Sequence, residues 1–381
     1  MKRTYGLREL NALREEQEIK TIYGTDIIVR KIPFETRKGI MDPRWMMFKY
    51  SDKKSESGMV PPAFPPEWLS LPNDELLAKI QAGMAAVLSK KDERVKDGDF
   101  HAECVWDEVA FPERTVGFYR YEASGRGKTN RPCVIMLHGG GWFMGKPLKN
   151  DSALLFLAER TNAVVYDVDY ALAPQNKYPA ALTDCWNLLR YVYENAEFLG
   201  IDKHRIVIAG SSAGGNLSAA LALKDRDEKT NMLAMQILMV PVLLLAPGRE
   251  IEGYNASAND FETSEEVEKL IGKIEPMENS IALRLMVKGY IETYPDDAFT
   301  SYLSPLCEKD LQGLPKTLVM TASLDSLWPQ GVFYVKRLRD AGVDVKAIRY
   351  EGIEHETSGE FGVTPQIEDL YMEIAAAINA L

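Results

Sequence analysis

The sequence predicts an α/β protein with a mainly parallel central sheet that is flanked by helices. From residue 101 onward, short runs rich in β-branched residues alternate with helical stretches, which is typical of such a sheet. One of these runs leads through a glycine-rich turn at 210–215 directly into a helix. A stretch at about 242–305 has no clear strand and interrupts the alternation. We therefore expect an N-terminal cap region at 1–100 and a main α/β domain at 101–381, with a cap insertion at about 242–305.

The N-terminal region differs in character from the rest of the chain. Two helical patterns are present, one through Leu7, Leu10 and Leu13 in a charged background, the other from Asn73 to Lys90. Between them lies a segment rich in proline and aromatic residues, whose prolines exclude a central strand. We expect most of these aromatic side chains to pack on the main domain and a few to roof a binding cleft.

The main domain is expected to begin with two antiparallel strands, Glu103–Val109 and Thr115–Tyr121. Six further β-rich runs follow: Pro132–Leu137, Ala163–Val168, Arg205–Ala209, Met235–Val240, Lys316–Thr321 and Val345–Arg349. The helices expected between them include Asp151–Thr161, Ala180–Asn195 and Gln330–Ala341. An exposed edge strand such as Val345–Arg349 offers one way for two subunits to pair, so a homodimer is an open expectation.

Composition excludes several classes of function. The 381 residues are 46% hydrophobic and 27% charged, which is ordinary for a soluble protein with a sizeable core. A net charge of −11 argues against nucleic acid or an anionic membrane as the main partner. The first twenty residues lack the apolar core of a signal peptide, and the longest apolar run, Met232–Ala246, is too short to span a bilayer. Four widely spaced cysteines without a zinc or redox spacing indicate reduced thiols in a cytoplasmic protein.

The turn at 210–215 carries the pattern G-x-S-x-G, with Ser212 between Gly210 and Gly214. Between a strand and a helix, this pattern is typical of a nucleophile elbow, in which a sharp turn lifts the serine hydroxyl out of the sheet. Ser211 is not the central serine, because the residue two positions before it is Ala209. The alternative is a plain glycine- and serine-rich turn.

A serine needs an adjacent base to act as a nucleophile at neutral pH. In the arrangement that uses this elbow, the chain order is serine, acid, histidine. The chain has four histidines, and only His355 follows Ser212. It lies in a polar loop after the last expected strand, so the alternative is a surface histidine.

Asp325 is the candidate acid, because it directly follows the strand at 316–321 and precedes His355 by 30 residues. That interval has room for one helix and one strand. The alternative role of such an aspartate is a helix N-cap. Glu308 and Asp310 are weaker candidates, since they precede the strand.

A glycine run, Gly139-Gly140-Gly141, follows His138 at the end of a buried strand. It is typical of an oxyanion loop, in which backbone N–H groups approach a substrate oxygen. The expected donors are the N–H groups of Gly139, Gly140 and Ala213, and His138 is expected to hold the loop. The run is not a dinucleotide motif, because Met144 occupies the third glycine position. No metal or cofactor is expected.

Together these motifs resemble the hormone-sensitive-lipase-type esterases, the HGGG class (bacterial family IV) of the α/β-hydrolases. The matching motifs are HGGGW at 138–142, GSSAGG at 210–215, YALAP at 170–174 and the late Asp and His. The resemblance covers roughly residues 100–381 and implies an α/β-hydrolase core with a helical cap. It implies a serine carboxylesterase that hydrolyses short- to medium-chain acyl esters of small molecules through an acyl-enzyme.

Two positions depart from the family pattern. Members commonly have Asp or Thr where Ser211 stands, and Arg where Ala171 stands. Loss of that arginine removes a structural salt bridge and affects local packing, not the chemistry.

The sequence leaves the substrate open. The same three residues serve a deacetylase of a sugar or natural product, or an amidase or peptidase, because the oxyanion chemistry is shared. A non-catalytic binding module of this fold normally lacks one of the three residues. The aromatic side chains of Trp142, Phe143 and Trp328 flank the catalytic positions, and either line the substrate pocket or belong to the core.

Overall fold

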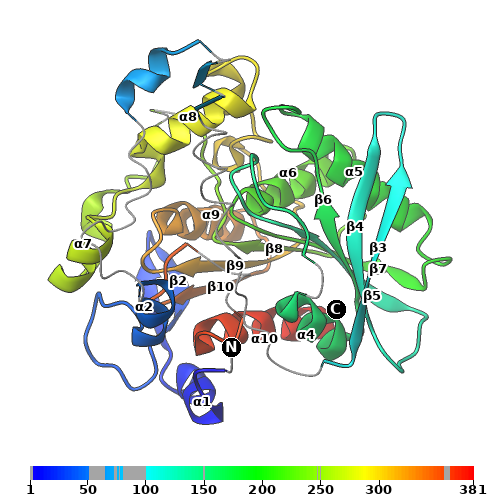
Figure 1. Ribbon diagram of the computed structural model, residues 1–381, viewed down its shortest axis with the longest axis horizontal. Coiled ribbons are helices and arrows are strands. Elements are labelled where there is room, and N and C mark those ends of the chain that lie inside the picture. The colour runs from blue at the N-terminus through cyan, green and yellow to red at the C-terminus, as the bar shows by residue number, and fades with distance from the viewer. Residues whose placement is uncertain are drawn as a thin grey trace.

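In the computed structural model, a single ten-stranded sheet forms the centre of the protein (Figure 1). The structure describes residues 3–50, 65–72, 75–76, 78–79, 100–148, 151–246, 248, 250–355 and 361–381. The strand order is β1-β2-β10-β9-β8-β7-β5-β6-β4-β3. The bounds are β1 (Glu18–Ile22), β2 (Thr25–Arg30), β3 (Ala102–Ala110), β4 (Thr115–Ala123), β5 (Arg131–Leu137), β6 (Val164–Asp169), β7 (Ile201–Ser211), β8 (Met235–Met239), β9 (Lys316–Ala322) and β10 (Val345–Tyr350). All pairs from β2 to β6 are parallel, which confirms the predicted sheet.

Helices cover both faces of this sheet. Their bounds are α1 (Leu7–Glu15), α2 (Pro43–Tyr50), α4 (Ser152–Thr161), α5 (Ala180–Glu194), α6 (Ala213–Asp227), α7 (Glu265–Ile271), α8 (Ile281–Tyr290), α9 (Trp328–Asp340) and α10 (Pro365–Asn379). In Figure 1, α4 and α10 lie on one face, whereas α5, α6 and α9 lie on the other. Every residue of β5 and β8 is buried, as expected for parallel strands covered on both sides. No helix among the described residues is long and apolar enough to cross a membrane.

The elements predicted for the main domain are confirmed. Each of the eight predicted strands and three predicted helices overlaps an observed element. The leucine pattern near the N-terminus forms α1, which buries Leu10 and Leu13 but leaves Leu7 exposed. The helix predicted at 73–90 lies largely outside the described residues.

Two strands of the N-terminal region belong to the central sheet, which the sequence did not predict. β2 pairs in parallel with β10, with Ile28 opposite Ile348, and β1 pairs antiparallel with β2. Residues 18–30 are therefore part of the α/β domain and not of a cap. The suggestion that Val345–Arg349 is an exposed edge strand is wrong, because β2 covers it. Its outer edge is occupied at 348–350 by β2 and is not open there to a second subunit.

The stretch at 242–305 forms α7, α8 and short 3-10 helices but none of the sheet strands, as the sequence predicted. The N-terminal segment that contains the 3-10 helix η1 (Pro66–Ser70) meets α8, since Lys288 Nζ donates to the carbonyl of Leu71 at 3.0 Å. Parts of both predicted cap segments therefore lie against one another.

Candidate active site

Ser212 lies in a strained turn between β7 and α6. Its backbone has φ = 56° and ψ = −114°, a conformation that non-glycine residues rarely adopt. The flanking glycines allow the bend, because a Cβ at Gly210 would lie 2.2 Å from the carbonyl oxygen of Gly214. A Cβ at Gly214 would lie 2.0 Å from the carbonyl oxygen of Leu137. The predicted strand–turn–helix geometry is therefore present, and it requires glycine at both positions.

The structure brings the three predicted residues together. His355 Nε2 lies 2.8 Å from Ser212 Oγ, and His355 Nδ1 lies 2.9 Å from Asp325 Oδ2. The Asp325 side chain is fully buried, and its Oδ1 accepts the N–H of Leu327 at 2.9 Å. The three residues follow β7, β9 and β10, and the ends of parallel strands meet at one edge of the sheet.

The carboxylates of the alternative acids, Glu308 and Asp310, accept hydrogen bonds from backbone N–H groups of their own turns. Glu308 accepts the N–H of Asp310, and Asp310 accepts the N–H of Gln312. Asp325 does not act as the N-cap of α9, whose N-cap residue is Leu327.

The glycine loop after β5 lies directly against the serine turn. A Cβ at Gly139 would lie 3.3 Å from Ser212 Cβ, and Gly140 has a φ of 121° that favours glycine. Within the described parts of the chain, the N–H groups of Gly139 and Gly140 donate to no protein acceptor. Ala213 is the first residue of α6, where a helix presents unsatisfied N–H groups and a positive dipole end. The geometry is suited to a developing oxyanion beside Ser212 Oγ.

The side chain and the carbonyl of His138 hold this loop in place. Its Nδ1 donates to the carbonyl of Gly139 at 2.8 Å, and its own carbonyl accepts the hydroxyl of Tyr170 at 2.7 Å. The two rings stack with centroids 4.2 Å apart. Burial lowers the pKa of His138 to about 4, so this imidazole is neutral at physiological pH. These contacts match the structural role predicted for His138.

The insertion packs on both loops of the site. Met286 of α8 lies so close to Gly141 that a Cβ there would be 1.8 Å from its Cε. Tyr290, also of α8, stacks on Trp142 with ring centroids 4.8 Å apart. The N–H of Met277 donates to the carbonyl of Ser326, next to Asp325. Sequence reasoning missed these contacts, because the apolar pattern of α8 does not say which loop its buried face meets.

The three aromatic side chains predicted to flank the pocket are buried. Trp142 has no exposed surface, and Phe143 is almost fully covered. Trp328 lies under the guanidinium of Arg349, 5.0 Å from the ring centroid, and stacks on Tyr23. Pocket lining by these side chains stays a prediction, and their present packing favours a supporting role.

Position 171 has no arginine side chain, but a cation from the turn between β3 and β4 reaches the carboxylate that binds its backbone. The N–H of Ala171 donates to Asp184 Oδ2 at 2.8 Å, and the guanidinium of Arg114 lies 3.4 Å from the same oxygen. Asp184 is buried, so Arg114 supplies the cation that its carboxylate requires. The local packing is therefore maintained.

The arrangement has the geometry that a nucleophile, a base, an orienting acid and an oxyanion site require. No group of His, Cys, Asp and Glu side chains in the described part of the chain is arranged to hold a metal ion. The chemistry that this arrangement of Ser212, His355 and Asp325 supports is acyl transfer through a covalent serine intermediate.

Comparisons with known proteins agree with this geometry. A family model described as "alpha/beta hydrolase fold" matches residues 134–358. The chain is 34% identical over 245 residues to an arylesterase of Saccharolobus solfataricus, covering 63% of this chain and 72% of the relative. It is 33% identical over 248 residues to the carboxylesterase NlhH of Mycobacterium tuberculosis, with the same two coverages. A solved structure of a hyperthermophilic esterase from Pyrobaculum calidifontis superposes with a TM-score of 0.67 at 26% identity, covering 90% of this chain and 98% of that one.

Proposed function

Because this chain belongs to the α/β hydrolase family and is an ester hydrolase, we propose that Ser212, His355 and Asp325 form its catalytic triad. The observation that carries the proposal is the continuous chain of hydrogen bonds from Asp325 through His355 to Ser212 Oγ. Its natural substrates are small-molecule esters with short to medium acyl chains.

The first half of the reaction acylates the serine. His355 Nε2 takes the proton of Ser212 Oγ, and this oxygen attacks the ester carbonyl carbon. The tetrahedral oxyanion is held by the N–H groups of Gly139, Gly140 and Ala213. His355 then donates its proton to the leaving alcohol as the carbon–oxygen bond breaks.

The second half releases the acid by the same steps. Water enters the place of the alcohol, loses a proton to His355 and attacks the acyl carbon. Collapse of the second tetrahedral intermediate returns the proton to Ser212 Oγ and frees the carboxylic acid. Asp325 orients the imidazole and stabilises its positive charge in both halves, and it stays ionised.

The test is turnover of p-nitrophenyl butyrate by the wild type and by Ser212→Ala. We expect turnover by Ser212→Ala to fall by about 10⁶-fold, close to background. Ser211→Ala is the matched control, since it removes the neighbouring hydroxyl and leaves the triad intact. Turnover by Ser212→Ala within tenfold of the wild type would refute the proposal.

Two substrate series resolve the remaining specificity. Matched p-nitrophenyl ester and p-nitroanilide substrates distinguish ester hydrolysis from amidase or peptidase activity. Acetyl, butyryl, octanoyl and palmitoyl esters measure the acyl preference, and acetylated sugars test the deacetylase alternative. Activity confined to emulsified long-chain triglycerides contradicts the short- to medium-chain preference.

We also place the enzyme in the cytoplasm. The four cysteines form no disulfide with one another in the part of the chain that the structure describes, which is typical of a reducing compartment. The net charge of −11 disfavours nucleic acid as a partner. Size-exclusion chromatography with light scattering tests the homodimer that the sequence left open.

A further inference from the structure

The loop that carries His355 is held from outside the main domain by the N-terminal helix α2. We propose that Glu354 is a positioning residue, which fixes His355 by locking this loop onto α2. The inference rests on the proposed function, since it assigns a role relative to the base of that triad. It gives the N-terminal region a role in positioning the base, in addition to the cap role that the sequence predicted.

Three donors of α2 converge on the Glu354 carboxylate. Trp45 Nε1 donates to Oε2 at 3.0 Å, and the hydroxyl of Tyr50 donates to Oε1 at 2.9 Å. Lys49 Nζ lies 3.2 Å from Oε2 and also above the Trp45 ring. The Glu354 side chain is only 14% exposed, and Trp45 is fully buried. Three donors that converge on one largely buried carboxylate restrict its side chain, so they hold the loop of Glu354 against α2.

The same loop meets the N-terminal segment at a second point, two residues earlier. The N–H of Asp42 donates to the carbonyl of Gly352 at 2.8 Å. A side chain at Gly352 is excluded, because its Cβ would lie 2.4 Å from Ile32 Cδ1 and 3.0 Å from the nitrogen of Asp42. Gly352 also has a φ of 79°, which favours glycine. The loop is therefore shaped for close contact with the N-terminal segment.

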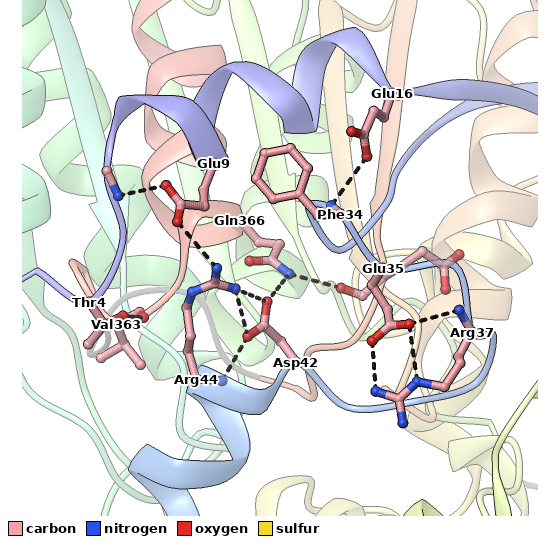
Figure 2. Close-up of polar contacts among 12 residues, drawn as sticks. Thr4, Glu9, Glu16, Phe34, Glu35, Arg37, Asp42, Arg44, Val363 and Gln366 are labelled. Carbon is pink, nitrogen blue, oxygen red and sulfur yellow. Dashed lines mark hydrogen bonds and ion pairs between the residues drawn. The ribbon is translucent and has the colours of Figure 1, made fainter.

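The start of α2 is itself firmly anchored. Figure 2 shows Asp42 between Arg44 and Gln366. Asp42 Oδ1 accepts the N–H of Arg44 at 2.8 Å, as the cap of α2, and Oδ2 accepts Gln366 Nε2 at 3.0 Å. The same Gln366 nitrogen donates to the carbonyl of Glu351 at 3.2 Å, so one side chain of α10 joins α2 to the loop.

These contacts bear directly on the base. His355 immediately follows Glu354, and its imidazole must bridge Asp325 at 2.9 Å and Ser212 at 2.8 Å. The imidazole side chain itself is 36% exposed, so its place depends on the backbone that carries it. A shift of about 1 Å at such a centre costs on the order of 10²-fold in rate. Holding Gly352 and Glu354 prevents that shift.

The test compares Glu354→Ala, Glu354→Gln, Tyr50→Phe and Trp45→Phe in the full chain. Glu351→Gln is the matched control, because it removes another carboxylate of the same loop. That carboxylate pairs with Arg349 and not with α2. Three quantities are measured: kcat and KM for p-nitrophenyl butyrate, the rate constant for inactivation by a fluorophosphonate, and the melting temperature. Assays run well below every melting temperature.

We expect Glu354→Ala to lower kcat and the inactivation rate constant together, by about ten- to a hundredfold, with KM within threefold. Glu354→Gln keeps an acceptor and restores part of the loss, and Tyr50→Phe, the mildest change, costs a few fold. Glu351→Gln stays within twofold of the wild type. The proposal is overturned if the melting temperature falls while both rates stay at the wild-type level, because the role is then only structural. Failure of the proposed triad is seen separately, as full turnover by Ser212→Ala.

Discussion

Replacing Asp325 with Asn tests whether the orientation of the imidazole, and not only its presence, limits catalysis. The change keeps the size and shape of the side chain and removes one charge. Asp325 is fully buried, so no solvent replaces what is lost. One carboxylate oxygen accepts the backbone N–H of Leu327 at 2.9 Å, and the other faces His355 Nδ1 at 2.9 Å.

The backbone N–H of Leu327 determines the orientation of the asparagine amide group. That N–H requires an acceptor, so the amide oxygen takes its place there and the NH₂ group points at His355 Nδ1. Nδ1 must then accept, which leaves the proton on Nε2, facing Ser212 Oγ at 2.8 Å. An imidazole in this tautomer cannot take the serine proton. The same change in Ser-His-Asp proteases costs about 10⁴-fold in kcat, or about 5.4 kcal/mol of barrier.

The assay is kcat for p-nitrophenyl butyrate at neutral pH, with circular dichroism to verify folding. Asp310→Asn is the control, since it makes the same substitution in one of the alternative acids, whose carboxylate accepts the N–H of Gln312 in its own turn. We expect that control to retain full activity. A folded Asp325→Asn enzyme within tenfold of wild-type kcat would refute the assignment of the acid.

Two further predictions concern the elbow and the acid stability of the fold. Gly214→Ala places a Cβ 2.0 Å from the backbone oxygen of Leu137, so we expect loss of active, soluble protein. Gly127→Ala is the control, because a Cβ there has open space around it, and we expect it to be tolerated. Soluble expression and ester turnover of the two variants test this prediction. Burial acts to raise the pKa of Glu373, but Lys346 and neighbouring arginines outweigh it and lower that pKa. A lowered pKa stabilises the fold at neutral pH and that stability is lost as the pH falls through it. We therefore expect Glu373→Gln to lower the free energy of unfolding by about 3 kcal/mol at neutral pH, as measured by urea unfolding curves. The difference in unfolding free energy between the variant and the wild type should become smaller below about pH 4. A difference that stays constant with pH contradicts this prediction.

Much of the main domain was predictable because its signals are local. Short apolar runs separated by helical stretches mark the strands, and the run before Ser212 ends in a turn that only glycine neighbours allow. The proposed triad could be selected from the sequence for a different reason, namely that few residues of the required types occur in the required order. Only one histidine follows Ser212, and one aspartate directly follows the intervening strand. The hydrogen bonds at 2.8 and 2.9 Å agree with that selection.

The N-terminal strands could not be predicted in the same way. The run Ile27-Ile28-Val29 is rich in β-branched residues, but it is short and lies more than 300 residues before its partner β10 in the sequence. No local sequence pattern predicts that this strand joins the edge of a sheet formed by distant residues. The pairing depends on which edge the rest of the fold leaves open.

The sequence by itself indicated the residues to which we assign the chemistry of this protein: the serine turn, the glycine loop, and the histidine and aspartate that follow in order. Only the tertiary structure decided what holds that chemistry in place. It set α8 against the oxyanion loop and α2 against the loop of His355, through contacts such as that of Trp45 with Glu354. The physical reason is range. A turn or a strand is encoded by neighbouring residues, whereas a contact between residues 309 positions apart exists only once the whole chain has packed.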